Sequence, residues 1–168
     1  MRSSCPNPQF ASRHVRIGKQ EDRNTPSGIE ARMAEAINVV KALKTRALDA
    51  GVKFGFENHA GDLRAKEVLS LIQEVGSDVC GAMLDHGNLL WSMDYRMKHI
   101  QKLGPFAVCN SIRDYMVWPS NEGATFQWTE IGEGLMDVPA YVNQLKEVSP
   151  GVSLFVETIS NSPLPFLF

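Results

Sequence analysis

Three carboxylates, Glu57, Asp85 and Glu157, are the residues best placed in the sequence to do chemistry, because each directly follows a short apolar run. If each run is a strand of a parallel sheet, these side chains meet at the carboxyl edge, where functional groups of such folds collect. Converging carboxylates repel one another unless a proton or a cation lies among them. Carboxylate oxygens suit a hard divalent cation, so the pattern predicts a Mg²⁺ or Mn²⁺ site. The alternative is that each acid only caps the next helix or faces solvent.

Two histidines lie beside these acids. His59 lies two residues beyond Glu57, so both side chains could point into one site on an extended backbone. The alternative for His59 is a loop histidine bonded to the backbone. His86 directly follows Asp85 and would point the opposite way if the strand continued, which argues against a role as a ligand.

Hydrophobic periodicity predicts the strands and helices that must position these acids. Strands are predicted at residues 13–18, 52–57, 79–84, 106–112 and 152–159. Helices are predicted at residues 27–50, 62–75, 94–103 and 137–148. Ser27 and Glu30 have the spacing of a capping box at the start of the first helix, and Gly51 can end it. Asp62 and Asp137 are predicted to cap two later helices.

The segment between the fourth predicted strand and the last helix is predicted to be a long, partly aromatic loop. Trp118 and Trp128 could wall a sugar pocket by ring stacking, or they could pack under the loop, which the sequence slightly favours. The run Gly132-Glu133-Gly134 is too short for a phosphate loop, so its glycines are predicted to serve a turn.

The order of these elements predicts an α/β fold, because strands that alternate with helices build a parallel sheet with helical crossovers. The order alone does not separate a barrel from an open doubly wound sheet. The first strand–helix turn lacks a glycine-rich phosphate fingerprint, which argues against nucleotide binding.

Composition excludes several classes of protein. The chain has 168 residues, a formal net charge of −2 and 43% hydrophobic residues, which is typical of one soluble globular domain. No broad basic face is present, so no nucleic acid partner is expected. Cysteines 5, 80 and 109 match no zinc pattern and suit a reducing compartment. Neither a signal peptide nor an apolar run long enough for a membrane span is found, so we expect a cytoplasmic protein without a membrane partner.

Five short motifs, taken in order, resemble the xylose isomerase-like TIM-barrel superfamily, which includes sugar phosphate isomerases and epimerases, ketose 3-epimerases, inosose dehydratases and the endonuclease IV group. They are Phe56–His59, Leu84–Asn88, Ile112–Asp114, Ile131–Gly134 followed by Asp137, and Val156-Glu157. The resemblance runs from about residue 13 to residue 159. It implies a partial (β/α)₈ TIM barrel of about five parallel strands, the fourth to the eighth of the family pattern, with helices on the outer face. Residues 1–12 would form an irregular segment before this domain of residues 13–168.

The resemblance also implies roles for single residues. Glu57, Asp85 and Glu157 match three of the four metal ligands of the ketose epimerases, and the two glutamates match their acid/base pair. The fourth ligand, a histidine, falls on or beside Ser111, and a neutral serine is a poor ligand. Water or His59 would then complete the metal shell, or metal binding is weak, or the chemistry has been abandoned.

Three further residues, His59, Asn88 and Arg113, are the candidates to hold substrate hydroxyls or a phosphate. The expected function is a divalent-metal-dependent isomerase or epimerase of a sugar or sugar phosphate, working by proton transfer beside a carbonyl. The expected partner is a small sugar or polyol, and the sequence is compatible with a homo-oligomer.

Two alternative functions remain open from the sequence. One is an inosose dehydratase-like lyase, which uses a similar site. The other is a non-catalytic barrel fragment or pseudoenzyme, which the serine at position 111 supports. A full barrel takes roughly 250 residues, so a truncated gene product is also expected. Endonuclease IV activity is disfavoured, since few histidines lie at the strand ends.

Overall fold

The computed structural model describes residues 17–18, 20–59, 63–92, 95–121, 123–157 and 162–166. The irregular segment predicted at 1–12 and most of the strand predicted at 13–18 lie outside these residues, as does the cap predicted at Asp62. Residues 17 and 18, which are described, belong to no strand.

A parallel sheet carries the predicted strand ends. Its strands are β1 (Phe54–Glu57), β2 (Cys80–Asp85), β3 (Ala107–Ile112) and β6 (Leu154–Val156). They pair in the order β1-β2-β3-β6 and all run parallel. This order confirms the α/β prediction of a partial barrel, with four of the predicted strands among the described residues.

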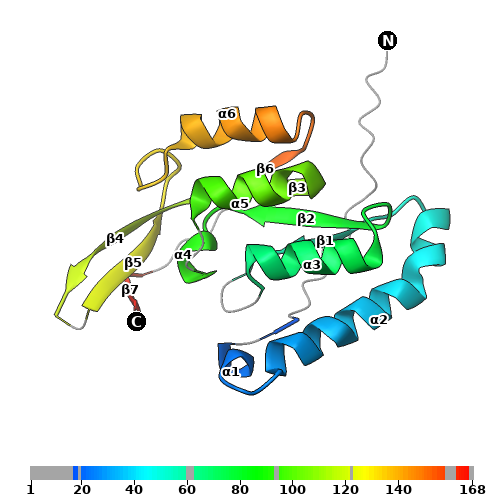
Figure 1. The fold of residues 1–168 in the computed structure, drawn as a ribbon. Coiled ribbons are helices and arrows are strands. Elements are labelled where there is room, and N and C mark those ends of the chain that lie inside the picture. The colour runs from blue at the N-terminus through cyan, green and yellow to red at the C-terminus, as the bar shows by residue number, and fades with distance from the viewer. Residues whose placement is uncertain are drawn as a thin grey trace, which may run out of the picture.

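Helices separate these strands. They are α1 (Gln20–Arg23), α2 (Gly28–Asp49), α3 (Ala65–Val75), α4 (Leu89–Ser92), α5 (Arg96–Leu103) and α6 (Val138–Val148), with a 3₁₀ turn at Gly104–Phe106. Figure 1 shows α3 and α5 along one face of the parallel sheet, with α2 and α6 beside them. None of the described helices is both long and apolar enough to cross a membrane.

The apolar face of α3 forms the centre of the main core. Val68, Leu71 and Ile72 are fully buried there, and Cys80 and Ala82 of β2 belong to the same cluster. Burial of one such aliphatic side chain contributes roughly 1.5–3 kcal/mol, so this helix fixes the position of the strand that ends in the acid at position 85.

The caps of the helices follow the sequence only in part. Ser27 precedes α2 as predicted, but its φ of 54° is left-handed and its side chain makes no cap hydrogen bond, so the capping-box prediction is wrong. Gly51 follows the end of α2 with a φ of 63°, which suits glycine. Asp137 caps α6 as predicted, accepting a hydrogen bond from the Ala140 N–H at 3.0 Å.

A second, antiparallel sheet replaces the predicted aromatic loop. It consists of β4 (Asp114–Ser120), β5 (Gly123–Thr129) and β7 (Leu164–Phe166), in the order β4-β5-β7. In Figure 1 the β4–β5 hairpin extends away from α3, α5 and α6, with α4 beside it. The loop prediction is therefore wrong for residues 114–129.

An aromatic cluster explains why this hairpin forms. Tyr115 lies opposite Trp128 and Val117 lies opposite Phe126, so all four side chains share one face of the hairpin. Phe126 and Tyr115 are buried against this cluster, and Trp91 of α4 packs edge-on to Phe126 with ring centroids 5.0 Å apart. The alternation of these residues is the strand signal that the loop prediction overlooked.

Asp114 ties the hairpin to the loop before α6. Its Oδ1 accepts hydrogen bonds from the backbone N–H groups of Tyr115 at 2.8 Å and Met136 at 3.0 Å. Its Oδ2 accepts from Gly132 and Gly134, both at 3.0 Å. A Cβ at position 134 would lie 2.2 Å from Oδ1, so glycine is required there. The predicted turn at 132–134 is thus fixed by a buried carboxylate.

Substitution Asp114→Asn should destabilise the chain by about 2 kcal/mol or more, because an amide nitrogen cannot accept the two N–H groups that one carboxylate oxygen now accepts. Asp137→Asn is the matched control, since asparagine caps a helix about as well as aspartate and the cost should stay below about 0.5 kcal/mol. Denaturant unfolding measures both values. Equal losses would show that Asp114 does not organise the loop.

Candidate active site and metal centre

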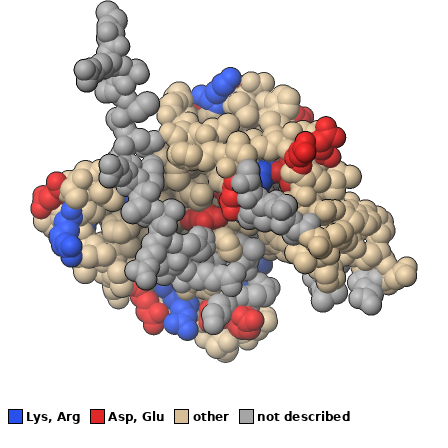
Figure 2. Space-filling model, turned by 180° about the vertical axis from the view of Figure 1, so that it is seen from behind, with Lys and Arg blue, Asp and Glu red and all other residues tan. Residues whose placement is uncertain are grey.

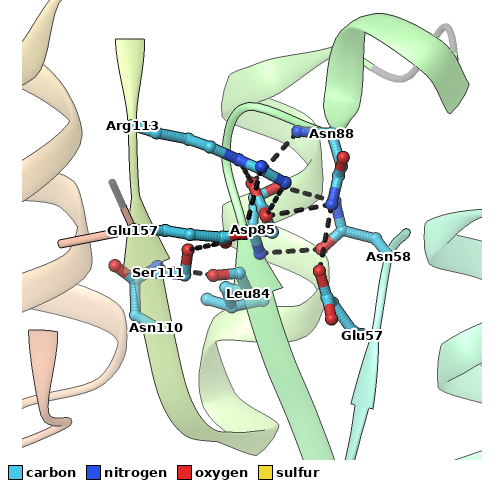
Figure 3. Close-up of polar contacts among 9 residues, drawn as sticks. All are labelled: Glu57, Asn58, Leu84, Asp85, Asn88, Asn110, Ser111, Arg113 and Glu157. Atoms are coloured by element: carbon cyan, nitrogen blue, oxygen red, sulfur yellow. Dashed lines mark hydrogen bonds and ion pairs between the residues drawn. The ribbon is translucent and has the colours of Figure 1, made fainter. Parts of the chain in front are cut away.

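The three predicted carboxylates converge at the carboxyl edge of the parallel sheet. Glu57 ends β1, Asp85 ends β2 and Glu157 follows β6. Each offers one oxygen, and these three oxygens lie within 4.8 Å of one another. Figure 3 shows the side chains pointing toward a common centre. The parallel register, which pairs Asp85 with Ser111, brings the strand ends together.

Asp85 is the most enclosed member of the cluster, with none of its surface exposed. Its Oδ1 accepts hydrogen bonds from the backbone N–H of Asn88 at 3.1 Å and from Nε of Arg113 at 3.2 Å. Its Oδ2 accepts from Nδ2 of Asn88 at 2.9 Å and from Nη2 of Arg113. Burial raises the pKa of Asp85, and the guanidinium of Arg113 opposes that rise. A buried carboxylate needs such partners to remain in a folded chain.

Arg113 links two of the three acids. Besides its pairing with Asp85, its Nη1 donates to Oε1 of Glu157 at 3.1 Å. The guanidinium carbon lies 4.2 Å from the ring centroid of Trp128, a cation–π contact. Ser111 donates from Oγ to the other oxygen of Glu157 at 2.9 Å. Positive charge at this edge of the sheet is therefore supplied by the chain itself.

Glu57 lies on the more accessible side of the cluster and accepts a hydrogen bond from Nδ2 of Asn88 at 3.0 Å. Burial, and then the negative charges of Asp85 and Glu157, raise the pKa of Glu57 to about 7. A carboxyl group with this pKa can take up or release a proton near neutral pH. Figure 2 shows acidic side chains near the middle of the face opposite to the view of Figure 1.

Asn58 is a residue of the site that sequence reasoning missed. It is buried, and its Nδ2 donates to the backbone carbonyl of Asp85 at 2.6 Å while its Oδ1 accepts from the backbone N–H of Asp85 at 2.9 Å. This pair of bonds fixes the end of β2 to the end of β1. The available signal was an amide directly after Glu57 at a buried strand end.

Gly87 allows the site to close. A Cβ at this position would lie 2.7 Å from Cγ of Arg113 and 2.7 Å from Cζ3 of Trp128. Any side chain there would push the guanidinium or the indole away. Glycine is required at position 87 because the side chains of Arg113 and Trp128 lie so close to its backbone.

The two histidines beside the acids have different positions. His59 is partly buried just beyond β1 and does not belong to the described group of carboxylates that could hold a metal. His86 is buried and packs edge-on to Tyr141 with ring centroids 4.3 Å apart. Of the expected substrate-holding residues, Asn88 and Arg113 therefore contact the carboxylates directly.

The sequence and the fold of this chain are similar to those of known proteins. The family model described as xylose isomerase-like TIM barrel matches residues 9–166. The chain belongs to the xylose isomerase-like TIM-barrel family. No curated protein matches the chain. The match covers both the parallel strands and the hairpin between them.

Solved structures of xylose isomerase-like barrels share the fold. A xylose isomerase domain protein from Planctomyces limnophilus has a TM-score of 0.66 and 21% identity, over 86% of this chain and 51% of that one. A xylose isomerase-like TIM barrel protein from Mycobacterium smegmatis, in complex with magnesium, has a TM-score of 0.64 and 17% identity, over 76% and 44%. The probable 3-DHS dehydratase AsbF of Bacillus anthracis has a TM-score of 0.62 and 14% identity, over 77% and 51%. The chain thus spans about half the length of these proteins.

The residues present fit a divalent cation in type and spacing. Three carboxylate oxygens within 4.8 Å of one another are suitable hard donors. Ser111 stands where the resemblance implies a histidine ligand, and its hydroxyl donates to Glu157 instead. The three acids could therefore hold a metal.

The carboxyl carbon of Glu57, observed by NMR in ¹³C-labelled chain, should titrate with a midpoint of about 7. In Asp85→Asn the midpoint should fall, because one neighbouring negative charge is gone. Since the folded chain binds this proton more tightly than the unfolded chain, the stability that Glu57 contributes is present below pH 4.5 and lost as the pH rises to about 7. The loss of the signal in Glu57→Gln assigns it, and a midpoint near 4.5 would contradict the interpretation.

Proposed function

We propose that this site belongs to an isomerase or epimerase that moves a proton beside the carbonyl of a sugar, a sugar phosphate or a related polyol. The observation that supports it is that two glutamates with different surroundings lie on either side of the buried Asp85. Glu57 has a pKa near 7, whereas Glu157 is held by Arg113 and Ser111. Separate environments for two carboxyl groups are the usual basis of acid and base assignments.

In the proposed reaction the two glutamates exchange a proton with the carbon next to the carbonyl. Glu157, whose Oε2 accepts a hydrogen bond from the hydroxyl of Ser111, would accept the proton from carbon. Glu57, whose pKa lies near neutral pH, returns a proton to carbon or oxygen. Their roles reverse in the opposite direction.

A divalent cation, Mg²⁺ or Mn²⁺, would be held by Glu57, Asp85 and Glu157. When bound, it supplies positive charge for the negative charge that develops on the substrate oxygen. The magnesium complex of the Mycobacterium smegmatis protein supports this choice of ion for the same fold. Asp85 would serve as a ligand rather than as a proton carrier, because none of its surface is exposed to a substrate.

The proposed substrate is a small polyhydroxylated carbonyl compound. Asn88 offers an amide next to Glu57 and Asp85, and Arg113 offers a guanidinium suited to a hydroxyl or a phosphate. His59, just beyond Glu57 along the chain, is the third candidate to hold a substrate oxygen. The ring of Trp128 contacts the guanidinium, whose central carbon lies 4.2 Å from the ring centroid.

Exchange of the carbon-bound proton with solvent tests the proposal without knowledge of the product. The chain is incubated in D₂O with Mg²⁺ or Mn²⁺ and with a ketose, a ketose phosphate or an inosose, and NMR follows the signal beside the carbonyl. We expect loss of that signal with at least one substrate. Glu57→Gln and Glu157→Gln should each slow the exchange by about 10²- to 10⁴-fold.

Glu147→Gln, on the exposed face of α6, is the matched control and should leave the rate unchanged. Loss of water from the inosose would assign the site to a lyase, the activity named for the Bacillus anthracis structure. Absence of exchange with every substrate would contradict the proposal and favour a non-catalytic chain.

A further inference from the structure

Asp85 has no free position for another ligand. A carboxylate offers about four lone-pair sites on its two oxygens. Asn88 donates to both oxygens, through its backbone N–H at 3.1 Å and its Nδ2 at 2.9 Å. Arg113 also donates to both, through Nε at 3.2 Å and through Nη2. A cation can reach Asp85 only if one of these partners leaves.

Of the two partners, Arg113 is the one that a cation would displace. Asn88 is neutral, and its backbone N–H is fixed in the turn between β2 and α4. The guanidinium carries a positive charge, so a divalent cation among the same carboxylates repels it. The guanidinium is also carried on a long side chain, whose rotamer can change while the backbone stays in place.

Arg113 also occupies Glu157, the second acid for which a cation would have to compete. Its Oε1 accepts from Nη1 of Arg113 at 3.1 Å, and its Oε2 accepts from Oγ of Ser111 at 2.9 Å. The guanidinium is therefore bonded to two of the three acids that lie within 4.8 Å of one another. Figure 3 shows it reaching across from β3 to both of them.

We propose that Arg113 competes with a divalent cation for Asp85 and Glu157, so that these two carboxylates hold either the guanidinium or the metal. The guanidinium supplies one positive charge to these carboxylates in one state, and the cation supplies two in the other. The contact of the guanidinium with Trp128, at 4.2 Å, involves no carboxylate and is available to Arg113 in either state. The inference rests on the metal-holding acids of the proposed function and not on the reaction itself.

Calorimetric titration of the full chain with Mn²⁺ tests the competition. Arg113→Gln should bind Mn²⁺ about tenfold or more tightly than the wild type, the change that corresponds to one hydrogen bond to a charged group. A residue that merely supports the metal site would give the opposite sign. Addition of Asp85→Asn to Arg113→Gln should abolish the gain.

Arg23→Gln is the matched control, because Arg23 also donates to both oxygens of one carboxylate, those of Glu67, at 2.9 and 2.8 Å. This ion pair lies outside the carboxylate cluster, so its loss should leave Mn²⁺ affinity unchanged. A similar gain in both variants would show that lost stability, and not competition, governs the affinity, and would overturn the inference.

Arg113→Lys keeps the inference testable if Arg113→Gln does not fold. A single ammonium group cannot pair with both oxygens of Asp85 and with Glu157 at once, so Arg113→Lys should also bind Mn²⁺ more tightly than the wild type. Equal or weaker binding by the variants that fold, or no binding by any chain, overturns the proposal. Since calorimetry requires no turnover, this result is separate from that of the proton-exchange experiment.

Discussion

The buried negative charge of Asp85 is the constraint on which the rest of the site depends. With no exposed surface, this carboxylate cannot be solvated by water, and the chain must supply its partners. Asn88 in the following turn and Arg113 from the neighbouring strand end meet that need. The guanidinium that pairs with Asp85 also donates to Glu157. Arg113 therefore links the acid at the end of β2 to the acid that follows β6.

The parallel strands and the three acids at their ends could be predicted from the sequence. Apolar runs that alternate with helical periodicity predicted the parallel strands, and the carboxyl-end rule then predicted that Glu57, Asp85 and Glu157 would meet. The rule works because each acid is the first polar residue after an apolar strand, and it holds even for Glu157, whose preceding strand β6 is exposed among the described residues. The same reasoning predicted the end of α2 at Gly51 and the cap of α6 at Asp137, both of which are local features of the backbone.

Features that depend on distant partners could not be predicted in this way. Alternation of aromatic residues indicates the two strands β4 and β5, but it does not reveal that Tyr115 and Trp128 face each other across them. Asn58 directly follows Glu57, but this position does not reveal its role, which is to bind the backbone of a residue on the next strand. Ser27 has the type and spacing of a cap, but its left-handed backbone turns the side chain away from that role.

Trp128 joins the second sheet to the charged edge of the first. Its ring lies against the guanidinium of Arg113 and packs edge-on to Phe126, with ring centroids 4.7 Å apart. Because Gly87 has no side chain, this ring packs directly against the turn after β2. The indole is therefore an intrinsic fluorophore in contact with the charged edge of the site. If a cation displaces Arg113 from the carboxylates, we expect the tryptophan emission of the unlabelled chain to change.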